Sequence, residues 1–274
     1  MPPLILITND DGVLSPGLAA AVAAVRDLGE VLVVAPSQQQ SASGRAFFGD
    51  KEAQLRAVDL VVGGAAVRAY ACDCSPALAV QHGVAVLCRE RRPDLAISGI
   101  NYGENLGFNV TLSGTVGAAL QAAERRIPAL AVSLQTDHRY HFQYGAVDWP
   151  AAAHFTRLFA ERMLRQALPA DVHVLNVVVP EHATARTPSR ITRLARQSYF
   201  DTVLETPSAT SRIGDGHFGV HIDADRLEPD SDIYALVHDG VVSVTPLSLD
   251  LTSRVDRAAL GTLLLDGGGG PIRS

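Results

Sequence analysis

The sequence predicts an α/β protein built on a doubly wound sheet that is parallel or mixed. Short apolar runs alternate with Ala-rich stretches that follow a serine, and this alternation continues to about residue 180. The apolar runs are continuous, as in strands that are buried on both faces of a parallel sheet. Repeated alternation of strand and helix is typical of this fold class.

The apolar runs indicate where the strands lie. A Gly-Gly turn at residues 63–64 joins two of the runs into a hairpin. Another strand is expected to end at Ser98, and Gly99 is expected to begin a long Gly/Asn loop. The predicted strands cover residues 4–8, 30–35, 57–62, 66–71, 94–98, 128–134 and 172–179.

Serines mark the start of three predicted helices. Ser15-Pro16 and Ser75-Pro76 each combine an N-cap residue with proline at the first helical position, and Ser113 caps a third helix. The predicted helices cover residues 15–28, a stretch from residue 75, 113–126, 151–167 and 253–265.

The pattern changes after Pro180. Short alternating segments follow, such as 218–222 and 241–245, separated by Gly and Asp turns. We therefore expect an α/β core over residues 1–180 and a β-rich appendage over residues 181–274.

Composition excludes several classes of protein. A hydrophobic content of 47% is enough for a substantial core, and a net charge of -6 argues against a protein that coats nucleic acid with a basic face. No stretch approaches the roughly 20 apolar residues of a membrane span, and no basic segment precedes the first apolar run as in a signal peptide. Three cysteines are too few for a disulfide framework. We expect a cytoplasmic protein that binds neither DNA nor membranes.

Two adjacent carboxylates, Asp10 and Asp11, follow the first apolar run and precede Gly12. Ligand sites of parallel sheets lie just outside the carboxyl ends of the strands. Two neighbouring carboxylates repel each other and lose hydration there, and a divalent cation would offset both effects. Adjacent aspartates fit joint metal ligation better than a nucleophile paired with a separate acid.

Three further segments carry compatible chemistry. Residues 37–44 form a Ser/Gln loop whose hydroxyls suit a hard cation or a phosphate oxygen. Residues 98–107 offer the carboxamides of Asn101 and Asn105 between glycines. Ser113, Gly114 and Thr115 open a helix, whose free amide groups favour phosphate. Carboxylate, hydroxyl and carboxamide oxygens without histidine or thiolate indicate Mg²⁺, Mn²⁺ or Ca²⁺ rather than structural zinc.

These motifs resemble those of the SurE family, the survival-protein nucleotidases. The resemblance rests on four motifs in the same order, and weaker similarity extends it over nearly the whole chain. The motifs are residues 8–12, 35–41, 98–107 and 113–115.

The resemblance implies a Rossmann-like three-layer core with a C-terminal β-hairpin and a tail that exchanges between subunits, which gives homodimers or homotetramers. It implies metal-dependent hydrolysis of nucleoside 5′- and 3′-monophosphates, with exopolyphosphatase activity in some members. One Mg²⁺ or Mn²⁺ per subunit would be held by Asp10, Asp11, Ser41 and Asn101. Phosphate would contact Asn105, Ser113, Gly114 and Thr115.

One departure and several alternatives stay open. Leu14 stands where many members of the family have a polar residue or a histidine. If that residue helps to protonate the leaving group in the family, this chain must do so differently. Asp10 or Asp11 could instead be a nucleophile that forms an aspartyl-phosphate. A metal-dependent glycosyltransferase also uses paired aspartates after a strand. A nonenzymatic sensor of nucleotides or polyphosphate would keep the same metal- and phosphate-binding residues but would not hydrolyse its ligand.

Overall fold

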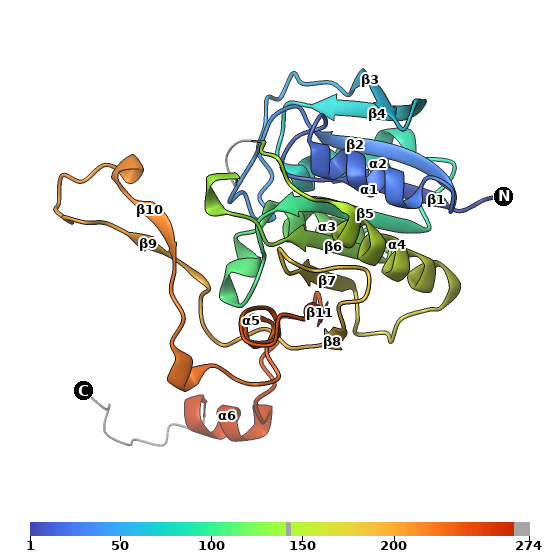
Figure 1. The fold of residues 1–274 in the computed structure, drawn as a ribbon. Coiled ribbons are helices and arrows are strands. Elements are labelled where there is room, and N and C mark those ends of the chain that lie inside the picture. The colour runs from blue at the N-terminus through green and yellow to red at the C-terminus, as the bar shows by residue number, and fades with distance from the viewer. Residues whose placement is uncertain (141–143, 266–274) are drawn as a thin grey trace.

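A nine-stranded, mainly parallel sheet forms the centre of the molecule (Figure 1). The computed structural model describes residues 1–140 and 144–265 and gives the strand order β3-β4-β2-β1-β5-β6-β7-β11-β8. The pairs from β4 through β7 are parallel, whereas β3 pairs antiparallel with β4, and β11 pairs antiparallel with β7. This confirms the predicted fold class.

The strands and helices occupy most of the predicted positions. The strands of the large sheet are β1 (Leu4–Thr8), β2 (Glu30–Pro36), β3 (Arg56–Val62), β4 (Ala65–Cys72), β5 (Leu95–Tyr102), β6 (Ala129–Leu134), β7 (Val174–Val179), β8 (Ser189–Ile191) and β11 (Val242–Leu247). The α-helices are α1 (Pro16–Val25), α2 (Pro76–Leu87), α3 (Gly114–Glu124), α4 (Pro150–Arg165), α5 (Asp232–Val237) and α6 (Arg257–Leu264).

Helices cover both faces of the sheet, which gives the three layers. Every residue of β1 is buried, and its side chains alternate between two cores. Ile5 and Ile7 pack in the core that α1 and α4 cover, whereas Leu4 and Leu6 pack in the core that α2 and α3 cover. The continuous apolar run at the start of the chain therefore serves both faces at once.

The C-terminal third contributes to the large sheet and also forms a separate hairpin. Strands β8 and β11 extend the large sheet beyond β7. Strands β9 (Phe200–Val203) and β10 (His217–Val220) pair antiparallel in a two-stranded arm that projects from the body (Figure 1). The division at residue 180 stays a prediction, and the glycine-rich end of the expected tail lies outside the described residues.

The predictions differ from the structure by about four residues at two element boundaries and by less at several others. β5 does not end at Ser98 but continues through Tyr102, because its pairing with β6 resumes at Asn101↔Ser133 after a register shift. The last helix begins at Arg257 rather than near residue 253, because Asp256 caps it by accepting a hydrogen bond from the Ala258 backbone N–H at 2.9 Å.

In the described part of the chain, no helix is long and apolar enough to cross a membrane.

Candidate active site

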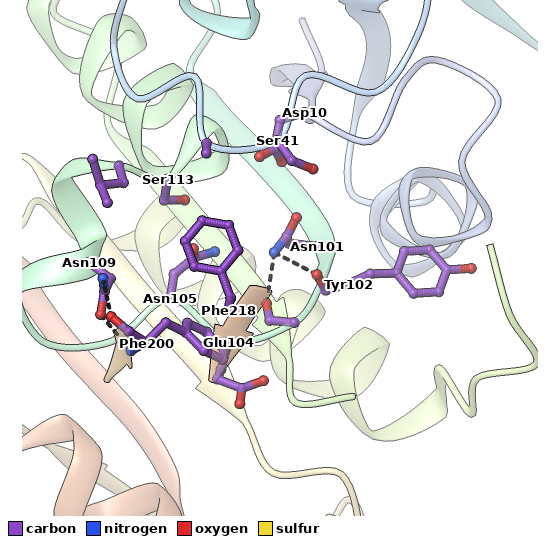
Figure 2. Close-up of a pocket in the computed structure, with 13 residues that line it drawn as sticks. Asp10, Ser41, Asn101, Tyr102, Glu104, Asn105, Asn109, Ser113, Phe200 and Phe218 are labelled. Carbon is purple, nitrogen blue, oxygen red and sulfur yellow. Dashed lines mark hydrogen bonds between the residues drawn. The ribbon is translucent and has the colours of Figure 1, made fainter. Parts of the chain in front are cut away.

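A cavity of about 120 Å³ opens where the carboxyl ends of β1 and β5 meet the N-terminus of α3 (Figure 2). The β1–β5 pairing places Thr8 beside Ser98, so the residues that follow both strands come together at one edge of the sheet. The cavity is lined by Asp10, Ser41, Ala42, Asn101, Tyr102, Gly103, Glu104, Asn105, Asn109, Leu112, Ser113, Phe200 and Phe218.

Asp10 and Glu104 are the two carboxylic acids that line this cavity, and Asp10 is only 5% exposed. The Thr115 hydroxyl donates a hydrogen bond of 2.5 Å to Asp10 Oδ1. Burial raises the pKa of Asp10 above its usual range, and the hydrogen bond from Thr115 opposes that rise. Ionised Asp10 therefore needs further positive charge to be stable here.

Asp11 is 2% exposed and turns its carboxylate toward the start of the Gly/Asn segment. Its oxygens accept hydrogen bonds of 3.2 Å from Gln39 Nε2 and from the Tyr102 backbone N–H. Burial raises the pKa of Asp11 well above its usual range, and the neighbouring charge of Asp10 raises it further. The Tyr144 hydroxyl donates to the Asp11 carbonyl at 2.6 Å and helps to hold this turn in place.

Asn101 presents its side-chain oxygen to the cavity. Its amide nitrogen donates to two backbone carbonyls, Tyr102 at 3.1 Å and Gly103 at 2.7 Å. These bonds orient the carboxamide so that the oxygen faces Asp10 and Ser41 (Figure 2). A carboxamide oxygen held in this way is a suitable ligand for a hard cation.

Ser41 reaches the cavity from the loop that follows β2, and this loop packs on α3. A Cβ atom at Gly117 would lie 2.1 Å from the Gly44 carbonyl oxygen, so only glycine at this point of α3 allows the close approach. The Gly44 N–H donates to the Leu112 carbonyl at 2.9 Å and fixes the same contact.

The start of α3 faces the cavity. Ser113 caps the helix, with its hydroxyl accepting from the Val116 N–H at 3.1 Å, and it lines the cavity. A Cβ atom at Gly114 would lie 2.7 Å from Asp10 Oδ2, so glycine lets the helix end approach the carboxylate. Asn105 donates from Nδ2 to Ser133 Oγ at 2.7 Å and keeps a second amide hydrogen for a ligand.

The structure thus brings five of the eight expected site residues into the cavity wall: Asp10, Ser41, Asn101, Asn105 and Ser113. The other three residues do not line the cavity but contact residues that do. Gly114 and Thr115 contact Asp10, and Asp11 accepts a hydrogen bond from the Tyr102 N–H. Leu14 is largely exposed and does not line the cavity.

Sequence reasoning missed the aromatic and polar residues that complete the wall. Phe200 and Phe218 come from the β9–β10 arm, about a hundred residues beyond the loop that carries Asn105, and Asn109 holds the root of that arm. Only the alternating pattern near residue 218 gave a signal, and it predicted a strand rather than a site.

The donor set suits a hard divalent cation. Within residues 1–140 and 144–265, no Arg, Lys or His forms an ion pair with Asp10 or Asp11, although both carboxylates are buried. The described residues also contain no group of three or more His, Cys, Asp or Glu side chains that could hold a metal. A site here would therefore combine carboxylate oxygens with the oxygens of Ser41 and Asn101, which is the chemistry of Mg²⁺ or Mn²⁺.

Comparisons with known proteins identify relatives of the whole chain. The family described as "Survival protein SurE" matches residues 5–201. A protein named 5′-nucleotidase SurE from Thermococcus kodakarensis is 43% identical over 92% of this chain and 95% of its own length. The protein of the same name from Thermococcus gammatolerans is 44% identical over 95% of both chains. The crystal structure of the SurE protein from Aquifex aeolicus superposes with a TM-score of 0.74 at 29% identity, covering 95% of this chain and 99% of that one.

Fold and cavity together define an α/β protein of the Rossmann-like class, with a cavity lined by carboxyl, hydroxyl and carboxamide groups at the carboxyl edge of its sheet. Within that class, the chain belongs to the SurE family.

Proposed function

We propose that this protein is a metal-dependent 5′-nucleotidase that hydrolyses nucleoside monophosphates to nucleoside and phosphate. The observation that carries the proposal is the buried pair Asp10–Asp11, which has no cationic partner among the described residues and lies against the N-terminus of α3. The names of the curated relatives support the same activity.

Four residues would hold one Mg²⁺ or Mn²⁺ per subunit: Asp10, Asp11, Ser41 and Asn101. When bound, the cation would neutralise the carboxylates, polarise the phosphoryl group and make water a better nucleophile at neutral pH. Each oxygen of Asp11 accepts one hydrogen bond, from Gln39 or from Tyr102, and keeps a lone pair for the cation.

The phosphate would lie against the first turn of α3. Free N–H groups at a helix start, together with the positive end of its dipole, stabilise an anion, and they do so more strongly as charge develops on the phosphoryl oxygens. We assign phosphate contacts to Ser113 and Asn105, and to the backbone at Gly114 and Thr115. The Thr115 hydroxyl is not assigned to phosphate, because it donates its hydrogen bond to Asp10.

Two finer activities belong to the same proposal. Hydrolysis of nucleoside 3′-monophosphates and of polyphosphate would use the same phosphate cradle, since both present a terminal phosphate to it. Assembly into dimers or tetramers is a separate proposal, and the exposed leucines of α6 support it: Leu260, Leu263 and Leu264.

The test is phosphate release from nucleoside 5′- and 3′-monophosphates, polyphosphate and p-nitrophenyl phosphate. Each substrate is measured with EDTA and again after Mg²⁺ or Mn²⁺ is restored. We expect release only with the metal, and faster from 5′-monophosphates than from p-nitrophenyl phosphate. A folded protein that binds nucleotide tightly but releases no phosphate with any metal would contradict the proposal and favour a sensor.

A further inference from the structure

One wall of the cavity is apolar, whereas the end that carries Asp10 is polar. This wall consists of Phe200 on β9, Phe218 on β10, and Leu112 just before α3. Phe218 is 45% exposed although it lines the cavity, so part of its ring is open to a ligand. In the close-up, Phe218 lies among the polar residues of the site (Figure 2). A phosphate ion has no apolar surface, so it would make no favourable contact with these side chains.

The hairpin register places both aromatic side chains on one face. Phe200 pairs with Val220, and Phe218 pairs with Thr202. Cross-strand partners lie on the same face, and residues two apart along a strand also share a face. Phe200 and Phe218 are therefore diagonal neighbours that face the cavity together.

We propose that Phe218 and Phe200 form a subsite that binds the aromatic base of the nucleotide by stacking. The proposal rests on the proposed function, because the phosphate end of the cavity must hold the phosphate of the same molecule. A flat, weakly polar base gains from contact with an aromatic ring whatever its exact hydrogen-bonding edge, since every base has a π face. The subsite therefore favours nucleotides over base-free phosphates without selecting strongly among bases.

The aromatic wall is fixed to the phosphate end through Asn109. Asn109 Oδ1 accepts hydrogen bonds from the Tyr199 N–H at 2.6 Å and from the Phe200 N–H at 2.9 Å, and its Nδ2 donates to the Phe200 carbonyl at 3.1 Å. Nearby, the Phe108 N–H donates to the Gln197 carbonyl at 3.0 Å. Asn109 is thus a positioning residue, which sets the distance between the stacking surface and the loop that carries Asn105.

The test compares AMP with ribose 5-phosphate, which has the same phosphate and sugar but no base. Phe218→Ala is expected to raise KM for AMP about tenfold or more, because one aromatic stacking contact is lost, and to leave kcat within about twofold. KM for ribose 5-phosphate should not change. Phe218→Tyr keeps the ring and should keep the affinity for AMP. Val220→Ala is the matched control, since Val220 lies on the same hairpin face but does not line the cavity.

Asn109 gives a second, independent readout. Asn109→Ala should raise KM for AMP as Phe218→Ala does, whereas Asn109→Asp keeps an oxygen acceptor for the two N–H groups and should restore most of the affinity. Unchanged AMP kinetics in Phe218→Ala, or an equal rise in KM for both substrates, would overturn the subsite. Failure of the proposed function would look different, because the unmodified protein would then release no phosphate from ribose 5-phosphate or from AMP.

Discussion

The Thr115 hydroxyl donates a hydrogen bond of 2.5 Å to Asp10 Oδ1, and this contact joins the end of β1 to the first turn of α3. It links the expected metal site to the expected phosphate site through one side chain. The orientation of Asp10 therefore depends on a residue that does not itself line the cavity.

Removal of this hydroxyl should impair turnover without unfolding the protein. Thr115→Val has nearly the same volume but leaves a buried carboxylate with one donor fewer, at a cost of about 1.5–3 kcal/mol for a hydrogen bond to a charged group. We expect kcat/KM to fall roughly tenfold to a hundredfold. Thr115→Ser, which keeps the hydroxyl, should retain most of the activity. Equal kinetics in both variants would show that the hydrogen bond does not matter.

Asp10→Asn should nearly abolish turnover by weakening metal binding. The substitution keeps the size of the side chain and removes one of two charges that attract the cation. Calorimetric titration with Mn²⁺ should show a much weaker site in the variant than in the unmodified protein. Near-normal turnover at limiting metal would contradict the assignment of Asp10 as a ligand.

Ser113→Ala should have a smaller effect than either substitution above. The hydroxyl caps α3 and lines the cavity, but the backbone N–H groups of the first turn remain as donors to phosphate. We expect a loss of about 1 kcal/mol in unfolding free energy and less than a tenfold loss in kcat/KM. Chemical denaturation and steady-state kinetics measure the two effects separately. A loss of activity as large as that of Asp10→Asn would mean that the hydroxyl itself is essential.

Glu104 should make stability fall as the pH rises. Its side chain is buried, Oε2 has no hydrogen-bond partner within the described structure, and burial raises its pKa despite the hydrogen bond from Tyr199; nearby Glu181 adds to the rise. An acid whose folded pKa exceeds its unfolded value stabilises the fold fully below the unfolded pKa, and this contribution is lost as the pH rises through the folded pKa. Glu104→Gln should therefore gain in melting temperature relative to the unmodified protein as the pH rises above the usual glutamate pKa of about 4.3. A difference in melting temperature that does not vary with pH would show that Glu104 does not titrate in this way.

Deletion of the chain from Ser253 onward should lower the molecular mass of the assembly. α6 has no buried residue in the single chain, and an apolar helix of this kind gains stability by packing against another subunit. Light scattering should report a smaller particle for the shortened protein. An unchanged mass would contradict a tail that joins subunits.

Local patterns were enough to predict that Asp10 and Ser113 lie at the same edge of the sheet, where both line the cavity. The run from Leu4 to Thr8 has no polar residue until its end, which identifies a buried strand, and the two aspartates that follow it lie at the edge of the sheet where ligands bind. Ser113 is recognisable as a cap because a serine before a helix satisfies the first free N–H groups.

Long-range pairing explains what the sequence could not show. Gly99 looks like the start of a loop, but hydrogen bonding of Asn101 and Tyr102 to β6 keeps that segment in the sheet. The aromatic wall depends on contacts between Asn109 and Phe200, which are 91 positions apart in the chain. A sequence pattern records local spacing, so it carries no information about either contact.

The position of β11 has a consequence for synthesis of the chain on the ribosome. β7 pairs on one side with β6, and on the other side with β11, the residues Val242–Leu247. Until those residues leave the ribosome, β7 is an open strand edge, the kind of surface that pairs with other chains and starts aggregation. A nascent chain that stalls before residue 242 would expose that edge, and chaperone dependence should therefore be greatest in the interval before the last strand is made.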